Sequence, residues 1–413
     1  MLFRSCMGVN VRTALKGIGP GLIIASVVLG PGSITVSSKI GSEYGYSLLW
    51  VVVLAAIGMG IYTMMSARYG VSHEKSILQS IAETYGRWLA VLIGLSAFLT
   101  ASSFQFGNNL GVATALQSLT GIEEYVWPLV FTPSAIILVL FAKNLYKVLE
   151  KLMMVLVMLM IFAFVTNLVF AGPNLLAVLK GFIPLSVPTG GLHVMAALIG
   201  TTFVLHVCLY QSYLVQNKGW RAADLAKGKI DTLAGVFILA AISILVIMTS
   251  GAALHPRSIT VSTAADMAIQ LEALFGTFAK FIFSIGLWAA AFSSLLVNAV
   301  MAGGLLADGL GLGRSMECTA PKIFTVLAML VGMVIAVFFR GDVVYALVLA
   351  QASSLFAVPS IGIGLFLVLN NKKIMGRFRN TAAQNIVAIF ALVLILLMVY
   401  YMYHRLISFL GNL

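Results

Sequence analysis

The stretch Leu29–Ser38, LGPGSITVSS, lies in the middle of the first long apolar segment of the chain. That segment covers residues 17–42 and is long enough to cross a bilayer as a helix. Gly-Pro-Gly at positions 30–32 opposes a continuous helix, because proline has no amide hydrogen and glycine weakens helices. Four residues with hydroxyl side chains follow, and the stretch contains no charged residue. The stretch therefore predicts a helix that is interrupted within the membrane beside uncharged polar groups.

The composition predicts an all-α integral membrane protein. Of the 413 residues, 61% are hydrophobic and only 9% are charged, whereas a soluble domain has about 25% charged residues. We expect one transmembrane domain over residues 1–413, embedded in the lipid bilayer and functional as a monomer. The predicted spans are 17–42, 47–68, 88–119, 127–142, 150–171, 191–215, 231–253, 277–306, 323–339, 343–370 and 382–403.

The net charge of +12 is concentrated in alternate connections between these spans. This alternation follows the positive-inside rule, so the charge indicates membrane orientation and not a nucleic-acid partner. We expect insertion in the cell (plasma) membrane, with the N-terminus cytoplasmic and the C-terminus extracellular or periplasmic. The basic connections contain Arg4, Arg12, Lys16; Arg68, Lys75, Arg87; Lys143, Lys147, Lys151; Lys218, Arg221, Lys227, Lys229; and Lys372, Lys373, Arg377, Arg379.

A second interruption is predicted in the sixth span, LIGTTFVLHVCLYQSYLVQ (198–216). Gly200 precedes two threonines there, and His206 is embedded among apolar residues. The first and sixth spans hold matching places if residues 17–171 and 191–370 are two five-span halves and 382–403 is an extra helix. Interrupted helices at matched places indicate the central site of a transporter, although a proline kink alone would explain the first.

Several stretches resemble one family of membrane proteins. They are YGYSLLWVVVLAAIG (44–58), SARYGV (66–71), PNLLAVLKGFIPLSVP (173–188), IGLWAAAFSSLLVNAVMAGGLL (285–306) and AQASSLFAVPSIGIGLFLVLNNKKIMG (350–376). With the two interruptions, they make the chain similar to the Nramp family of divalent-metal transporters, which has the LeuT-type fold. The resemblance implies two inverted five-helix repeats plus an eleventh helix, with helices 1 and 6 discontinuous.

The chain departs from this family at the metal ligands. The first-span motif of the family is Asp-Pro-Gly-Asn, but residues 30–33 are Gly-Pro-Gly-Ser. The sixth-span motif is Met-Pro-His, but residues 204–206 are Val-Leu-His. In the third span, where the family often has acidic residues on its proton route, Gln105 and Asn108 are candidates for a permeation route. The thirteen acidic residues all fall in loops or at span ends, so we expect no metal site and no cofactor.

The loss of the carboxylate, taken with the free amides that follow Pro31, favours a small anion as the substrate. The N-terminus of a half-helix carries about +0.5 charge and binds anions, and Ser33 is a suitable N-cap. The hypothesis is a secondary active transporter of a small inorganic anion, with bicarbonate as the first candidate. The predicted substrate-binding residues are Gly30, Pro31, Gly32, Ser33, Ile34, Thr35, Thr201, Thr202, Val204, His206 and Gln351.

Sodium is the expected coupling ion, because Ser293 and Ser294 stand where LeuT-type symporters place hydroxyl ligands. Helix-packing serines are the simpler explanation of this pair. Two other functions stay open: a divalent cation transporter for magnesium or manganese with an altered site, and a transport-dead substrate sensor. An enzyme is not expected, since no Ser/His/Asp, Cys/His or paired-carboxylate set converges in the spans.

Overall fold

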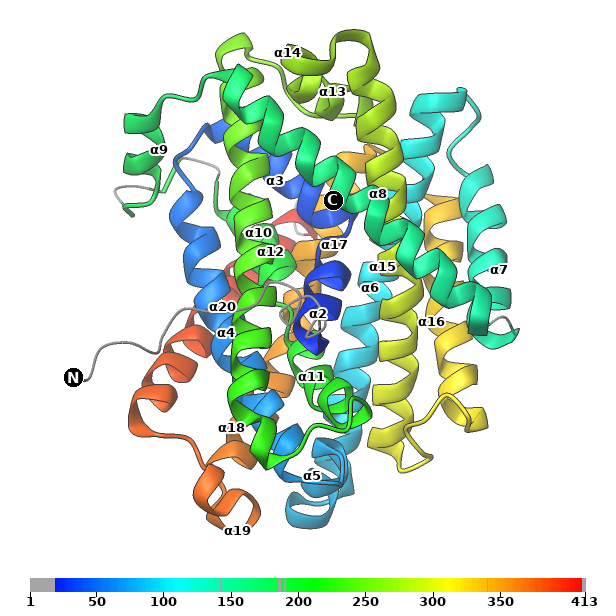
Figure 1. Ribbon diagram of the computed structural model, residues 1–413, viewed down its shortest axis with the longest axis vertical. Helices are drawn as coiled ribbons and strands as arrows, with labels where there is room; N and C mark the ends of the chain where they lie inside the picture. Colours follow the sequence, from blue (N-terminus) through cyan, green and yellow to red (C-terminus); the bar gives the residue numbers. More distant parts are fainter. Residues whose placement is uncertain (1–18, 142, 185–186, 189–190, 340, 411–413) are drawn as a thin grey trace, which may run out of the picture.

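The structure is a computed structural model that describes residues 19–141, 143–184, 187–188, 191–339 and 341–410. The predicted basic residues Arg4, Arg12 and Lys16 lie outside this part of the chain. The described chain is helical almost throughout, and Figure 1 shows most long helices side by side along one axis. The main helices are α2 (Pro20–Val28), α3 (Pro31–Tyr44), α4 (Leu49–Ser72), α6 (Arg87–Thr120), α7 (Val126–Phe141), α8 (Lys143–Ala171), α10 (Leu192–Thr202), α11 (Leu205–Asn217), α12 (Leu225–Ala253), α15 (Ala279–Leu310), α16 (Thr319–Phe338), α17 (Val343–Ser353), α18 (Val358–Asn370) and α20 (Ala382–Leu410).

Short helices occupy the connections between the long ones. The α-helical ones are α5 (Ile77–Tyr85), α9 (Leu175–Gly181), α13 (Ala264–Ala268), α14 (Glu272–Phe275) and α19 (Lys372–Met375). The 3-10 segments are η1 (Ala222–Asp224), η2 (His255–Arg257), η3 (Ile269–Leu271), η4 (Gly276–Phe278), η5 (Ser354–Ala357) and η6 (Gly376–Phe378). None of these is long enough to cross a bilayer, and all but η5, which lies within the tenth span, connect the membrane-crossing elements.

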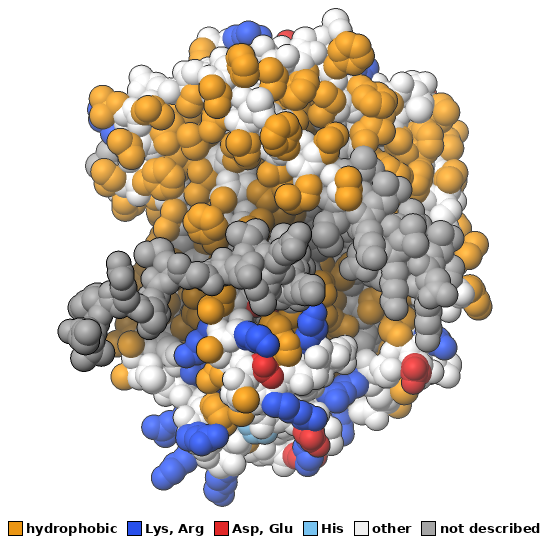
Figure 2. Space-filling model, viewed as in Figure 1, with side chains coloured by type: hydrophobic (Ala, Val, Ile, Leu, Met, Phe, Trp, Pro, Cys, Tyr) orange, Lys and Arg blue, Asp and Glu red, His pale blue; other side chains and the backbone are white. Residues whose placement is uncertain are grey.

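Each predicted span contains a helix or a pair of half-helices. In the described chain, seven helical stretches are long and apolar enough to cross a membrane, and four shorter apolar helices accompany them. The stretch formed by α10 and α11 is the most deeply buried: 89% of its most apolar 18 residues lie inside the bundle. For α20 the corresponding share is 22%. In Figure 2, apolar side chains, drawn in orange, cover much of the upper part of the visible face, as lipid contact requires.

Both predicted interruptions are confirmed. The first span is divided into α2 and α3, with Leu29 and Gly30 between them. The sixth span is divided into α10 and α11, with Phe203 and Val204 between them. Two broken helices therefore bring four helix ends into the interior of the bundle, and the half-helices α2 and α3 lie at its centre in Figure 1.

A third interruption, in the tenth span, is not predicted from the sequence. The predicted span over 343–370 is present, but the 3-10 segment η5 divides it into α17 and α18. Ser354 donates its hydroxyl to the carbonyl of Gln351 at 2.7 Å, and Pro359 stands in the first turn of α18. Such back-bonding and a proline together favour a local change of helix type. In the fifth predicted span, α8 begins at Lys143, earlier than the predicted start at residue 150.

The first half-helix is fixed at its start by α12. Asp231 accepts hydrogen bonds from the amides of Gly19 and Gly21, at 3.0 and 2.6 Å. These amides have no intrahelical partner, so the carboxylate of α12 serves as their cap. The two backbones touch at the crossing, since a Cβ on Gly235 would lie 2.1 Å from the carbonyl oxygen of Gly21.

We expect Gly200→Ala to destabilise the fold. A Cβ on Gly200 would lie 2.3 Å from the backbone oxygen of Gln351, so α10 and α17 would have to separate. Overpacking of this kind costs about 1–3 kcal/mol, which should lower the melting temperature in detergent. The matched control is Gly60→Ala in α4, whose Cβ would meet Val236 at 3.8 Å, an ordinary contact. Equal melting temperatures for the two variants would contradict this account of the packing.

Candidate functional site

The gap between α2 and α3 faces α6 and α15. Gly30 has no side chain, and a Cβ there would lie 3.1 Å from Ser294 Oγ and 3.3 Å from Asn108 Oδ1. The space beside Gly30 is thus bounded by a hydroxyl from α15 and an amide oxygen from α6. A larger side chain at position 30 would point directly at these two oxygens.

The next residues of α3 face α17. A Cβ on Gly32 would lie 2.1 Å from Nε2 of Gln351, so the amide of Gln351 rests against the α3 backbone. The same nitrogen is 3.5 Å from a Cβ built on Gly107 of α6. Gln351 therefore joins the first break to α6 and, through its own backbone, to Gly200 of α10.

Oxygen atoms without hydrogen-bond partners gather around the two breaks. Thr201 Oγ1, Thr202 Oγ1 and Gln351 Oε1 are buried and have no partner in the described structure. Thr35 Oγ1, one turn into α3, is in the same state. Buried polar atoms are normally paired, so an unpaired group of them indicates a ligand or an ion. All eleven predicted substrate-binding residues are buried.

His206 belongs to a chain of hydrogen bonds through one ring nitrogen, while its other ring nitrogen, Nδ1, is buried and has no partner in the described structure. Its Nε2 lies 3.1 Å from Asn298 Oδ1, which can only accept, so Nε2 is the donor. Asn298 Nδ2 donates to Ser294 Oγ at 2.9 Å, and Ser294 donates to the carbonyl of Val27 at 2.9 Å. The chain joins α11 through α15 to the end of α2. Asn298 is missed by the sequence analysis, although it follows Ser294 by four residues on one helix face.

Ser33 does not act as the N-cap of α3. The cap position is occupied by Gly30, and Ser33 lies inside the first turn, where its hydroxyl donates to the carbonyl of Gly30 at 3.3 Å. The amide of Ile34 bonds to the same carbonyl at 3.4 Å. The prediction of Ser33 as the N-cap is therefore wrong, because the cap lies three residues earlier at Gly30; of the three amides expected to be free, that of Ile34 has an intrahelical partner.

The two polar residues of α6 have different surroundings. Asn108 lies at the break, as its distance from Gly30 shows. Gln105 is fully buried and donates to the carbonyl of Leu295 at 2.7 Å, which places it in the contact between α6 and α15. Asn108 also donates to Gln105 Oε1 at 3.4 Å. Their roles in permeation stay a prediction.

Each of the two breaks brings together a helix end with partial positive charge and one with partial negative charge. The N-termini of α3 and α11 carry partial positive charge, and the C-termini of α2 and α10 carry partial negative charge. Carbonyls in the last turn of each half-helix have no intrahelical donor. In the described chain no three His, Cys, Asp or Glu side chains come together as a metal-binding group. The site is therefore rich in neutral oxygens and holds no cluster of charged ligands.

Comparison with solved structures shows the fold. The manganese transporter of Eremococcus coleocola, solved with an aromatic bis-isothiourea substituted compound, aligns with a TM-score of 0.79 and 19% identity, over 95% of this chain and 87% of that one. Mhp1, a nucleobase-cation-symport-1 family transporter, aligns with a TM-score of 0.59 and 13% identity, over 93% and 92% of the two chains. The fold is the LeuT type, with two inverted five-helix repeats, an eleventh helix and discontinuous helices 1 and 6.

Curated relatives are named as transporters of metal cations. A divalent metal cation transporter MntH of Deinococcus radiodurans is 26% identical over 378 residues, covering 89% of this chain and 84% of the relative. The MntH of Pectobacterium carotovorum subsp. carotovorum is 27% identical over 380 residues, covering 89% of each. These names overturn the prediction of a small-anion substrate, bicarbonate included. That prediction counts only the positive end of α3, whereas two carbonyl-bearing helix ends meet it in the break.

The family model of the natural resistance-associated macrophage protein-like proteins matches residues 21–405. This match covers nearly the whole described chain, from the start of α2 into α20. Together with the apolar helices, it makes the chain an integral membrane protein. The resemblance seen in the sequence is thus confirmed at the level of the family: the chain belongs to the Nramp family of transporters.

Proposed function

We propose that this chain is a secondary transporter of divalent metal cations, with magnesium favoured over manganese as the cargo. The proposal is carried by the group of unpaired buried oxygens at the two breaks, on Thr201, Thr202 and Gln351. Hydroxyl, amide and carbonyl oxygens are ligands that hard cations accept. The relatives named as divalent metal cation transporters support the same class of cargo.

The kind of ligand favours a hydrated ion. Magnesium gives up water reluctantly and is often bound with several waters in place. Carbonyl, carboxylate and water oxygens suit both Mg²⁺ and Mn²⁺, so the preference for magnesium rests on its stronger hold on water. Nε2 of His206 donates to Asn298, Nδ1 of the same ring has no partner in the described structure, and the side chain of Val204 offers no donor atom. We infer that Gly30, Ser33 and Val204 replace the Asp, Asn and Met ligands of the family, so the chain is a divergent member with a weakened metal site.

Three finer features belong to the same proposal. The chain acts as a transporter without catalysis and without a resident cofactor. Its N-terminus faces the cytoplasm, as the alternate basic connections predict. Residues 17–171 and 191–370 form the two repeats, and residues 382–403 lie outside them. A sensor that has lost transport receives no support from the structural observations described above.

Flux measurements on the purified full-length chain test the cargo. In proteoliposomes with an ion-sensitive dye inside, we expect influx of Mg²⁺ and, more weakly, of Mn²⁺. Neutral ligands predict low affinity, on the order of 10⁻³ M, as for weakly charged cation sites. Liposomes without protein are the control. Influx of neither cation would contradict the proposal.

Restoring the carboxylate should change the preference between the two metals. A side chain at position 30 points at Ser294 Oγ and Asn108 Oδ1, so Gly30→Asp adds a charged oxygen to an existing set of neutral ones. We expect the affinity for Mn²⁺ to rise by about tenfold or more, since a charged ligand offsets the cost of removing water from a dication. Isothermal titration measures it.

The matched control for this experiment is Gly30→Asn, which has the same size and no charge. It separates the effect of charge from the effect of volume, because either side chain must displace the neighbouring hydroxyl and amide by a few tenths of an ångström. A rise in Mn²⁺ affinity in the Asp variant alone supports a cation site at the break. Equal affinities in both variants and in the natural chain would place the cation elsewhere.

Sodium coupling is tested separately through Ser294. If sodium binds between this hydroxyl and the carbonyls of α2, sodium chloride should raise the melting temperature by roughly 2 °C or more over choline chloride. Ser294→Ala should lose that rise, and Ser284→Ala, a buried serine on the same helix, should keep it. Ser293 is half-buried, and Ser293→Ala shows whether both predicted serines take part. No rise in the natural chain would argue against sodium.

A further inference from the structure

The linker between α18 and α20, residues 371–381, presents four basic side chains to the outside. Lys372, Lys373, Arg377 and Arg379 are all exposed. None of the four forms an ion pair within 4.0 Å with a carboxylate of the described residues. The guanidinium of Arg377 lies over the ring of its neighbour Phe378, 4.9 Å from the ring centroid. The linker is therefore a concentrated and uncompensated positive surface.

The backbone of this linker is held in one shape. Asn371 caps α19 by accepting from the amides of Lys373 and Ile374, and the carbonyl of Ile374 lies 2.9 Å from His73 Nε2. At the far end, the amide of Asn380 donates to the carbonyl of Leu369 at 3.0 Å. The backbone that carries the four charged side chains is thus ordered. This order lowers the entropy cost of binding a ligand.

A fifth positive charge lies directly beneath. Arg68 of α4 is 8% exposed, and its guanidinium donates to the neutral amide oxygens of Gln384 and Asn380. Its Nε is buried and has no partner. A buried charge that no opposite charge compensates is costly, so an anion close to the linker would relieve it.

Carboxylates at the same end of the molecule are committed elsewhere. Glu74 pairs with Arg221 at 3.1 Å, and Glu83 pairs with Lys75 at 2.8 Å. Asp224 pairs with Lys227 at 3.6 Å. The positive charge of the other basic loop at this end, residues 218–229, is therefore partly neutralised by carboxylates. The charge of the linker is not neutralised in this way. Figure 2 shows the blue side chains gathered at the lower end, below the apolar surface.

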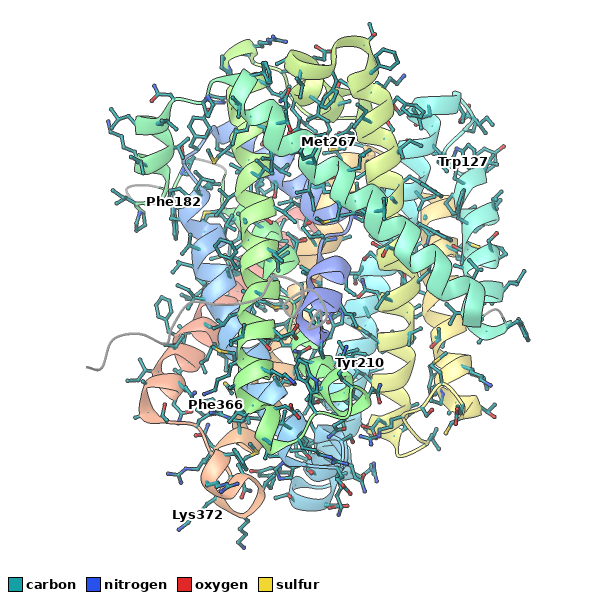
Figure 3. All side chains as sticks on the ribbon, in the orientation of Figure 1. Trp127, Phe182, Tyr210, Met267, Phe366 and Lys372 are labelled. Atoms are coloured by element: carbon teal, nitrogen blue, oxygen red, sulfur yellow. The ribbon has the colours of Figure 1, made fainter. Side chains whose placement is uncertain are left out.

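The linker stands where the lipid-facing surface of α20 begins. Only a few residues after Arg379, the side chains of Ile386, Ile389 and Phe390 are 68%, 48% and 58% exposed. Exposed apolar residues of this kind face lipid tails, so the linker lies at headgroup level. In Figure 3, Lys372 extends away from the bundle at its lower end, beyond Phe366 of α18.

We propose that this linker binds the headgroup of an anionic phospholipid. The four exposed cations supply the attraction, Arg68 adds to it from below, and the apolar start of α20 receives the acyl chains. The inference goes beyond the transport proposal and is independent of the cargo. A bound lipid would bridge the linker and α20 to the membrane surface on that side.

The test measures which lipid the full-length protein retains. The natural chain in neutral detergent is exposed to equal amounts of phosphatidylglycerol and phosphatidylcholine, repurified, and its bound lipids are quantified by mass spectrometry. We expect several-fold enrichment of phosphatidylglycerol. The variant Lys372→Gln/Lys373→Gln/Arg377→Gln/Arg379→Gln should reduce that enrichment by at least roughly threefold, because each basic residue near the surface contributes to lipid attraction.

The matched control removes the same number of charges from the other exposed loop at this end, as Lys218→Gln/Arg221→Gln/Lys227→Gln/Lys229→Gln. Loss in the linker variant with retention in the control supports the proposal. Equal loss in both variants, or unchanged enrichment in the linker variant, overturns it, as does displacement of the lipid by millimolar inorganic phosphate. If the fourfold linker variant does not elute as a folded protein, Lys372→Gln/Lys373→Gln is measured against the same outcomes.

Discussion

The constraint on which this structure depends is that backbone groups freed within a membrane must find partners inside the protein. Two helices are broken at mid-span, and each break frees amides on one side and carbonyls on the other. The surrounding helices supply part of the compensation, since Ser294 of α15 donates to the carbonyl of Val27 at the end of α2. The polar groups that have no partner at the centre, such as the side-chain oxygens of Thr201, Thr202 and Gln351, are available to bind an ion.

The electrostatic character of the central site depends on all four helix ends at the breaks, and not on the N-terminus of α3 alone. An amide-bearing end alone suggests an anion, and this is where the anion hypothesis fails. The C-termini of α2 and α10 face the same region, and side-chain oxygens of Thr201, Thr202 and Gln351 add acceptors without hydrogen-bond partners. A site of this composition has low net charge, so it discriminates between ions through hydration and geometry more than through attraction.

The features that could be predicted from the sequence are those that depend on residues close together in the chain. Gly-Pro-Gly at residues 30–32 and the apolar runs identify the first break and the spans, because proline and hydrophobicity act at the place where they occur. The bond between His206 and Asn298 joins residues 92 positions apart, and no local pattern announces it. The same holds for the cap that Asp231 of α12 supplies to α2, whereas η5 has local causes in Ser354 and Pro359.

The crossing of α2 and α12 has a mechanical consequence. The carbonyl of Gly21 lies where a Cβ of Gly235 would stand, and Asp231 holds the adjacent amides. Two backbones in direct contact cannot slide along each other without a collision between the residues on either side, but they can turn about the point of contact. The glycine pair is thus a pivot, and any tilt of the first half-helix carries with it a fixed point on α12.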